Sequence, residues 1–208
     1  WVQSSHDSSR AVTRYGGGSA GRRRALTLAT LTIGLPVLPV LYQGEELGLG
    51  DAELRPDEVQ DPLAVPGGHS RSRDVARTPL PWAPGPGLGF TTGDSAWLPF
   101  GDRRPEDTVA VQRGDPRSSL AAYRALLAAR RRLPGLRRGE VCWIDCDPPV
   151  LAYARGDCIV AANVGPHAET LRLPSGGWSV EFATNGGAFE RVEGQVPLGE
   201  EQAVILRR

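Results

Sequence analysis

The sequence predicts an α/β segment followed by an all-β domain. Residues 22–33 are rich in Ala and Leu and predict a helix, and the almost wholly apolar run 37–42 follows it. Residues 137–208 contain short apolar runs separated by turn residues. A helix followed by a buried strand is the repeat of a barrel or a doubly wound sheet, whereas short strands in series are typical of an antiparallel sandwich.

Composition narrows the class of protein. The chain has 208 residues, of which 40% are hydrophobic, enough for a sizeable core. Its 24 basic and 24 acidic residues give no net charge, so we expect neither nucleic acid nor an anionic membrane surface as a partner. No apolar run reaches the ~18–20 residues of a membrane helix. Met is absent even at position 1, and we therefore expect a segment of a longer chain.

The three cysteines predict no disulfide. Cys142 and Cys146 lie four residues apart on an expected strand, which separates them by about 13 Å, too far for a bridge. No C-x-x-C pair or nearby His suits a metal ion, so we expect no metal site. Reduced thiols in a cytoplasmic protein are the preferred interpretation.

The first α/β zone ends where sites are usually built. Gly16-Gly17-Gly18 is an expected flexible break, and the helix Arg22–Ile33 ends at Gly34-Leu35-Pro36. The run from Val37 to Tyr42 predicts a parallel strand buried on both faces. Gln43-Gly44-Glu45-Glu46 follows directly, at the carboxyl end of that strand, which in a barrel is the rim that carries sites.

Residues 50–114 are polar, rich in Pro and Gly, and without sustained periodicity. A loop of this length is rare in a compact domain unless it serves a site. Disorder is the rival interpretation, but the aromatic residues Trp82, Phe90, Trp97 and Phe100 argue against it. A helix is expected at residues 118–132, with a Ser at its N-cap, arginines in its last turn and Leu133-Pro134-Gly135 as its stop.

Residues 136–208 predict a small antiparallel β-sandwich. Turn residues, among them Pro148-Pro149 and Asn185-Gly186-Gly187, separate the runs. The expected strands are 141–145, 150–154, 158–164, 170–173, 178–183 and 202–206.

Four blocks, in order, resemble the α-amylase superfamily of retaining glycosidases. Ser5-His6-Asp7-Ser8-Ser9-Arg10 is similar to its seventh-strand motif, usually Asn-His-Asp-x-x-Arg, and residues 35–48 to its eighth strand and following loop. Residues 60–62 and 73–82 resemble the segment after that loop in α-glucosidases and oligo-1,6-glucosidases, and the C-terminal zone resembles the family's β domain.

The resemblance implies the C-terminal end of a (β/α)8 barrel, residues 1–135, followed by a β-sandwich domain, residues 136–208. It implies part of a retaining α-glucosidase that hydrolyses terminal α-glucosidic bonds of short malto- or isomalto-oligosaccharides, without a cofactor. The family's nucleophile and acid/base precede the seventh-strand motif, so we expect the isolated chain to be inactive. Alternatives are a trehalose synthase-like or other transglycosylating enzyme, and a non-catalytic carbohydrate-binding remnant.

The resemblance also assigns site residues. Asp7 corresponds to the third carboxylate, which stabilises the transition state, and His6 donates to the same sugar hydroxyls. Arg10 either anchors the loop or lines the site. Arg73 either holds a sugar hydroxyl or pairs with Asp74 or another loop acid.

Other polar and aromatic residues near the blocks have structural interpretations. Arg77 is expected to be structural. Glu45 and Glu46 are expected to shape the rim, because adjacent residues point to opposite sides. Trp82 and Trp97 either stack on sugar or pack in the loop.

Three positions depart from the family pattern. Ser5 stands where Asn is usual, Val37 where Gly is frequent, and Pro81 where oligo-1,6-glucosidases commonly have Gln. The last change favours a maltose-type substrate preference.

Overall fold

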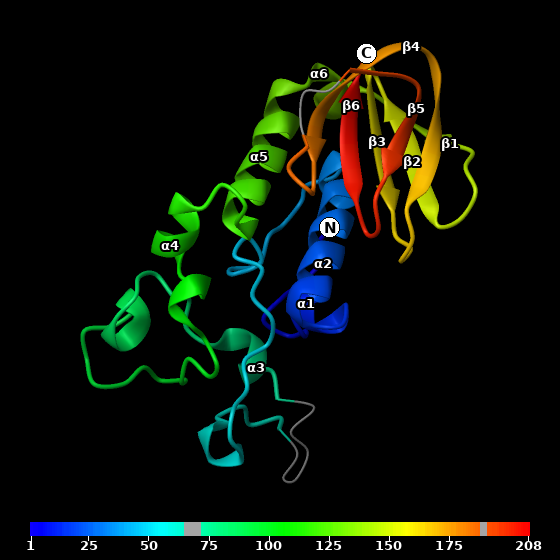
Figure 1. Cartoon of the computed structure of the whole chain (residues 1–208). Coiled ribbons are helices and arrows are strands. Elements are labelled where there is room, and N and C mark those ends of the chain that lie inside the picture. Colours follow the sequence, from blue (N-terminus) through cyan, green and yellow to red (C-terminus); the bar gives the residue numbers. More distant parts are fainter. Residues whose placement is uncertain (65–71, 188–190) are drawn as a thin grey trace. The chain divides into compact units, whose positions relative to one another are not determined.

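The computed structural model describes residues 1–64, 72–187 and 191–208. Its helices and helical turns are α1 (Ala11–Arg14), α2 (Gly18–Gly34), η1 (Pro56–Glu58), α3 (Asp74–Arg77), η3 (Pro86–Gly89), η4 (Pro105–Asp107), α4 (Val109–Gly114), α5 (Ser119–Arg132) and α6 (Pro134–Arg138). Its strands are β1 (Val141–Ile144), β2 (Val150–Arg155), β3 (Cys158–Asn163), β4 (Glu169–Ala183), β5 (Arg191–Leu198) and β6 (Ala203–Arg207) (Figure 1).

The chain folds into two compact units, each built from segments distant in sequence. Unit 1 contains Trp1, Arg23–Pro39 and Ala122–Arg208. Unit 2 contains Val2–Arg22 and Val40–Ala121. Helices α2 and α5 therefore contribute residues to both.

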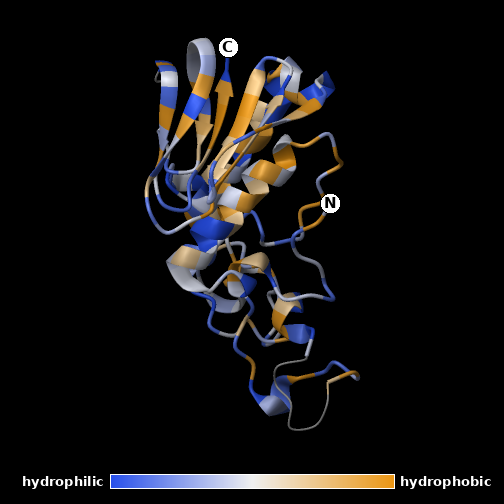
Figure 2. Ribbon diagram, turned by 90° about the vertical axis from the view of Figure 1, so that its right-hand side faces the viewer, coloured by the Kyte–Doolittle hydropathy of each residue, from blue (hydrophilic) through white to orange (hydrophobic). Residues whose placement is uncertain are grey.

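Unit 1 contains one six-stranded antiparallel sheet in the order β1-β2-β3-β6-β4-β5. Hydrophobic residues recur along these strands (Figure 2). The all-β prediction for the C-terminal zone is confirmed, while the division into two stacked sheets is not.

Two strand predictions need correction. The runs 170–173 and 178–183 belong to a single strand, β4, because a bulge between Arg172 and Gly177 absorbs the expected turn while pairing with β5 continues on both sides. Gly176 supports this bulge with a φ of 120°. Strand β5 was not predicted, because its Glu193-Gly194-Gln195 segment lacks apolar alternation.

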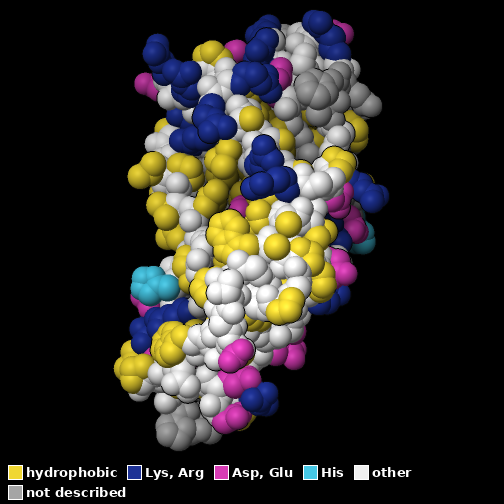
Figure 3. Space-filling model, turned by 90° about the vertical axis from the view of Figure 1, so that its left-hand side faces the viewer, with side chains coloured by type: hydrophobic (Ala, Val, Ile, Leu, Met, Phe, Trp, Pro, Cys, Tyr) yellow, Lys and Arg dark blue, Asp and Glu magenta, His cyan; other side chains and the backbone are white. Residues whose placement is uncertain are grey.

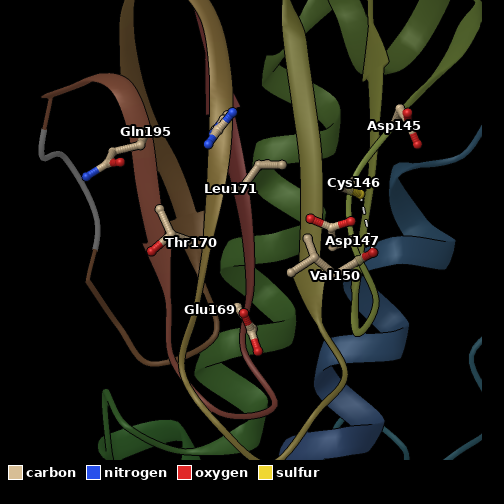
Figure 4. A pocket seen from close by; sticks show the side chains of 9 residues that line it. Asp145, Cys146, Asp147, Val150, Glu169, Thr170, Leu171 and Gln195 are labelled. Atoms are coloured by element: carbon tan, nitrogen blue, oxygen red, sulfur yellow. Dashed lines mark hydrogen bonds between the residues drawn. The ribbon is translucent and has the colours of Figure 1, made fainter.

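The sheet curves around its main core. One buried cluster includes Val150 of β2, Ile159 of β3, Leu171 of β4, Leu198 of β5 and Leu206 of β6. At one end of this core a polar cavity of about 570 Å³ opens between the β1–β2 connection and strands β4 and β5. Figure 4 shows its lining side chains, with Asp147 and Glu169 contributing carboxylates to it.

The C-terminal half of α2 packs on the other face of the sheet. The Tyr153 hydroxyl donates to the Leu31 carbonyl at 2.6 Å, and Arg155 Nη1 donates to the Gly34 carbonyl at 2.8 Å. A Cβ at position 34 would collide with the Tyr153 hydroxyl and the Val160 side chain, so this close approach requires glycine. Burial raises the pKa of Tyr153, which remains a neutral donor.

Arg130 of α5 satisfies carbonyl groups at the C-terminus of α2. It donates to Ile33, to Leu35 at 2.9 Å and to Val37 at 2.7 Å. These carbonyls have no partner within a helix, so a neighbouring guanidinium stabilises the end of α2.

The expected helices are present. Helix α2 begins four residues before the predicted start and ends at Gly34, as predicted from Gly34-Leu35-Pro36. Helix α5 spans Ser119–Arg132, in agreement with the expected 118–132. The Ser118 hydroxyl accepts from the Ala121 amide at 3.1 Å, which is the contact expected of an N-cap.

Unit 2 is mostly irregular. The region 50–114 contains only short helical turns among the described residues, and residues 65–71 of the predicted loop lie outside them. Even so, Leu47, Leu49 and Leu80 form a small buried cluster, so this region contains packed structure.

The predicted buried strand at 37–42 is wrong for this structure. Its pairing in the described chain is one parallel bridge, between Val40 and Val2. Leu38 is 80% exposed and Val40 is 52% exposed. A parallel strand is buried only when neighbouring strands and helices cover it, and a single bridge does not provide that cover.

The surface carries several large apolar side chains. Figure 3 shows hydrophobic side chains exposed on one face. Besides Leu38, the most exposed are aromatic: Trp1, Trp97 and Trp143. Within the described chain, no helix combines the length and the apolar character that crossing a membrane requires.

Candidate functional site

Two arginines hold the Asp7 carboxylate in unit 2. Arg73 Nη1 donates to Asp7 Oδ1 at 3.1 Å, and Arg77 Nη2 donates to the same oxygen at 2.9 Å. The second oxygen, Oδ2, lies 3.2 Å from His6 Nε2. The Asp7 side chain is 55% exposed, so the carboxylate is both positioned and accessible.

Arg73 is itself fixed by Asp61. Its Nε and Nη2 donate to the two carboxylate oxygens of Asp61 at 2.8 and 2.7 Å, and the Arg73 amide donates to Asp61 Oδ2 at 2.9 Å. The Asp61 side chain is fully buried. A bidentate pair of this kind leaves Arg73 with Nη1 directed at Asp7.

A second buried carboxylate supports the first. Asp74 Oδ2 accepts from the amides of Gln60 and Asp61, both at 2.7 Å. Asp74 thereby fixes the segment that carries Asp61. Of the predicted partners of Arg73, Asp74 or another loop acid, the structure contains the second, because Asp61 is the loop acid that binds Arg73.

The short helix α3 explains why two arginines reach one carboxylate. Arg73 is its N-cap residue and Arg77 is its last residue, four positions later. Residues at this spacing lie on one side of a helix. Arg77 also donates from Nε to the His6 carbonyl at 2.7 Å, so it binds both the backbone and the side chain of the His6-Asp7 pair.

The surroundings favour an ionised Asp7. Partial desolvation raises its pKa, but the hydrogen bond from Arg73, the charge of His6 and the hydrogen bond from Arg77 outweigh it and leave the pKa below the ordinary value of 3.8. The hydrogen bond from Arg73 also lowers the pKa of Asp61, and Asp61 in turn raises the pKa of Arg73. All three groups therefore remain charged at neutral pH.

Arg10 has the environment of an anchor. It is 2% exposed, and its Nη1 and Nη2 donate to the carbonyls of Gln43 at 2.6 Å and Ala76 at 2.8 Å. Its guanidinium lies 5.0 Å from the centre of the Tyr42 ring. This geometry supports the loop-anchoring alternative, and Arg10 thus links the segment after the expected eighth strand to α3.

Glu45 is a buried acid that the sequence identified only as part of the rim. It is 5% exposed, and its Oε2 accepts from the Tyr42 amide at 3.2 Å. Burial raises its pKa from 4.5 to about 7. Its side chain turns back on the preceding residues, in keeping with a structural role.

The two tryptophans of the loop differ in their surroundings. Trp82 is 48% exposed, and its backbone amide donates to Leu88 at 2.7 Å. Trp97 is 75% exposed and lines a cavity. The residues that the structure describes contain no group of three or more His, Cys, Asp and Glu side chains able to hold a metal ion.

The structure places the side chains of His6, Asp7 and Arg73 together. It adds two partners to which the sequence assigns no site role, Asp61 and Arg77. The four-residue spacing of Arg73 and Arg77 was the available signal for Arg77.

Comparison with known proteins gives a consistent family. The model of the alpha-amylase catalytic domain matches residues 1–139. The chain is 35% identical over 182 residues to a probable alpha-glucosidase of Rhizobium meliloti, covering 84% of this chain and 32% of that protein. It is 30% identical over 208 residues to Maltase A1 of Drosophila melanogaster, covering 94% of this chain and 35% of that protein. The chain thus spans about a third of the length of these relatives.

Solved structures agree with this. The alpha-glucosyl transfer enzyme XgtA is 35% identical, with a TM-score of 0.79, over all of this chain and 40% of its own. The trehalulose synthase MutB from Pseudomonas mesoacidophila MX-45 is 28% identical, with a TM-score of 0.83, over all of this chain and 42% of its own. These neighbours imply the TIM barrel as the fold of the catalytic domain. Because the family model covers 139 of its 208 residues, the chain belongs to the α-amylase family of glycoside hydrolases.

Proposed function

We propose that the chain is the C-terminal part of a retaining α-glucosidase that acts on terminal α-glucosidic bonds of short malto- or isomalto-oligosaccharides. The observation that carries this proposal is the accessible Asp7 carboxylate, to which Arg73 and Arg77 donate at 3.1 and 2.9 Å. In this proposal residues 1–135 complete a (β/α)8 barrel and residues 136–208 form a β domain.

Asp7 acts as a third carboxylate beside a nucleophile and a general acid. A retaining glycosidase passes through an oxocarbenium-like transition state in which positive charge develops on the sugar ring. An ionised Asp7 accepts hydrogen bonds from two neighbouring sugar hydroxyls, and these bonds strengthen as the charge develops. His6, with its Nε2 3.2 Å from Asp7 Oδ2 and its side chain 68% exposed, donates to the same hydroxyls.

The arginines have different proposed roles. Arg73 presents Nη1 near Asp7 and binds a hydroxyl of the terminal glucosyl unit, which favours attack at the chain end. Arg77 is a positioning residue that holds the His6 carbonyl and the Asp7 carboxylate. Arg10 anchors the loop behind them.

The nucleophile and the acid/base are proposed to lie upstream of Trp1, so the isolated chain is expected to be inactive. Reading the source DNA upstream of the Trp1 codon tests this. A reading frame that continues through family motifs with an Asp and a Glu supports the proposal. A stop codon close to Trp1 contradicts it and favours a non-catalytic carbohydrate-binding remnant.

Glucosyl transfer is the second candidate. Its support is that the similar structures include an alpha-glucosyl transfer enzyme and a trehalulose synthase. Both chemistries use the same third carboxylate, so product analysis on maltose separates them. Glucose as the sole product indicates hydrolysis, and an isomeric disaccharide or a longer oligosaccharide indicates transfer.

A reducing compartment such as the cytoplasm remains our proposal for location, since Cys142, Cys146 and Cys158 are all free thiols. Counting thiols in protein isolated from its source under denaturing, non-reducing conditions tests it. Fewer than three reactive thiols would contradict it.

A further inference from the structure

A second cavity of unit 2 has the composition of a sugar-binding pocket. It measures about 480 Å³ and lies between the segment around η1 and residues 91–100. It shares no lining residue with the cluster around Asp7. Its two walls differ in chemistry, one aromatic and the other charged.

Trp97 forms the exposed part of the aromatic wall. Trp97 is 75% exposed, while the next residue, Leu98, is 2% exposed. The buried Leu98 therefore anchors the backbone that presents the indole. Phe100 lines the same cavity, and Phe90 packs edge-on against it with ring centres 6.1 Å apart. This contact restrains the Phe100 ring.

The opposite wall is polar, and its residues are linked by ion pairs and a hydrogen bond. Arg55 pairs with Asp57 at 3.2 Å and with Glu58 at 2.9 Å. The Arg55 amide also donates to Glu58 Oε2 at 2.8 Å, which closes the first turn of η1. Gln60 continues this wall, and its amide is held by the buried Asp74. Ion pairs thus link Arg55 to both carboxylates of this wall.

The two walls are joined at their base. Gly101, with a φ of 63°, packs so closely on Ala52 and Glu53 that a Cβ there would lie 2.8 Å from each. The Glu53 amide also donates to Asp102 Oδ1 at 3.4 Å. These contacts therefore join the segment just before Arg55 to the segment just after Phe100.

We propose that this pocket, formed by Trp97, Phe100, Arg55, Asp57 and Gln60, binds a neutral oligosaccharide as a site additional to the one at Asp7. An indole face packs against the weakly polarised C–H groups of a sugar ring. The guanidinium and the carboxamide donate to sugar hydroxyls, and the carboxylates accept from them. The pocket has room for a small oligosaccharide, within the usual range for ligand sites.

An organic cation is the competing occupant, because an aromatic ring beside carboxylates also attracts positive charge. Arg55 opposes this. It contributes a positive charge to the same wall and already pairs with both Asp57 and Glu58. A ligand that both donates and accepts hydrogen bonds uses these groups better than a cation does.

Binding to the purified 208-residue chain tests the proposal. Maltotriose and isomaltotriose are titrated by calorimetry, and saturation-transfer NMR identifies the contacted protons. The wild-type chain is expected to bind at least one of them saturably in the millimolar range. Trp97→Ala is expected to weaken binding about tenfold, and Trp97→Phe less, because a smaller ring face remains.

A control variant separates this pocket from non-specific aromatic contact. Trp143→Ala removes a tryptophan of similar exposure, 69%, from strand β1. It is expected to bind within twofold of wild type. The proposal is overturned if no sugar binds, if Trp97→Ala binds like wild type, if Trp143→Ala weakens binding as much as Trp97→Ala does, or if tetramethylammonium displaces the sugar. Retained binding here does not depend on hydrolysis, so the proposed activity can fail independently.

Discussion

The Arg73 guanidinium lies between two carboxylates and donates to Asp7 with only one of its nitrogens, Nη1, at 3.1 Å. Its other two nitrogens are occupied by the buried Asp61. Arg73 is therefore preorganised before any ligand arrives, and the hydrogen bond to Asp7 requires no further ordering of this long side chain.

Removing either arginine is expected to raise the pKa of Asp7. Arg73→Gln and Arg77→Gln each delete a hydrogen bond to the carboxylate, and the larger rise is expected for Arg73→Gln, because its hydrogen bond lowers the pKa more. The measurement is the Asp7 carboxyl ¹³C shift against pH. Arg104→Gln, an exposed change elsewhere in unit 2, is the control. An unchanged Asp7 pKa in both variants would refute the positioning role.

Asp61→Asn is expected to destabilise unit 2. The substitution removes the buried charge that pairs with Arg73. Because folding lowers the pKa of Asp61, its stabilising effect is present above the unfolded value of about 3.9 and is lost as pH falls below it. We expect Tm at pH 7 to fall by several degrees, with a smaller difference from wild type near pH 2. Asp57→Asn removes an exposed carboxylate, and an equal loss of Tm from it would contradict this prediction.

Glu45 is expected to make stability decrease with rising pH. Folding raises its pKa from 4.5 to about 7, so the folded state binds the proton more tightly. The sign follows from this: its contribution is most favourable below pH 4.5 and is lost as pH rises through 7. The shift corresponds to at most about 3 kcal/mol of unfolding free energy.

Glu45→Gln isolates this contribution, since it keeps the size of the protonated side chain. The variant is expected to match wild type in urea unfolding at pH 4.5 and to exceed it in stability at pH 8. Glu53→Gln, at an exposed position, is the control. A Glu45→Gln variant with the same pH slope as wild type would show that Glu45 ionises freely.

Arg130→Ala is expected to lower the unfolding free energy by about 1–3 kcal/mol, because charged donors at carbonyl acceptors contribute on that scale. The affected groups are the Ile33, Leu35 and Val37 carbonyls. Arg131→Ala is a matched control in the same turn, with an exposed side chain. If both variants lower the unfolding free energy equally, the loss comes from removing a positive charge in the last turn of α5 and not from losing the hydrogen bonds to these carbonyls.

Local signals predicted those elements whose ends carry strong stop residues. Gly34-Leu35-Pro36 ends α2 and Leu133-Pro134 ends α5 because a Pro disfavours the helical conformation in the residue before it and has no N–H to donate to the preceding turn. Strand β5 is not predicted from the sequence, because its stability comes from pairing with β4 and not from its own composition.

The candidate site is also predictable only in part, because some of its residues come together only through tertiary contacts. His6 and Asp7 are adjacent in sequence, and a resemblance to one motif identifies both. Asp61 lies 12 residues from Arg73 and 54 from Asp7, and their association depends on tertiary folding. For the apolar run at 37–42 the sequence predicts a buried strand that the structure does not contain. Apolar composition predicts burial only where a partner surface is present.

The central claim is that Asp7 stabilises the transition state of α-glucoside cleavage. Its most direct test is the kcat/KM for p-nitrophenyl α-glucoside of the complete reading frame that contains this chain, compared with the same protein carrying Asp7→Asn. The expected loss is about a hundredfold to a thousandfold, mostly in kcat and with the protein still folded at the assay temperature. Equal activity of the two proteins would contradict the claim.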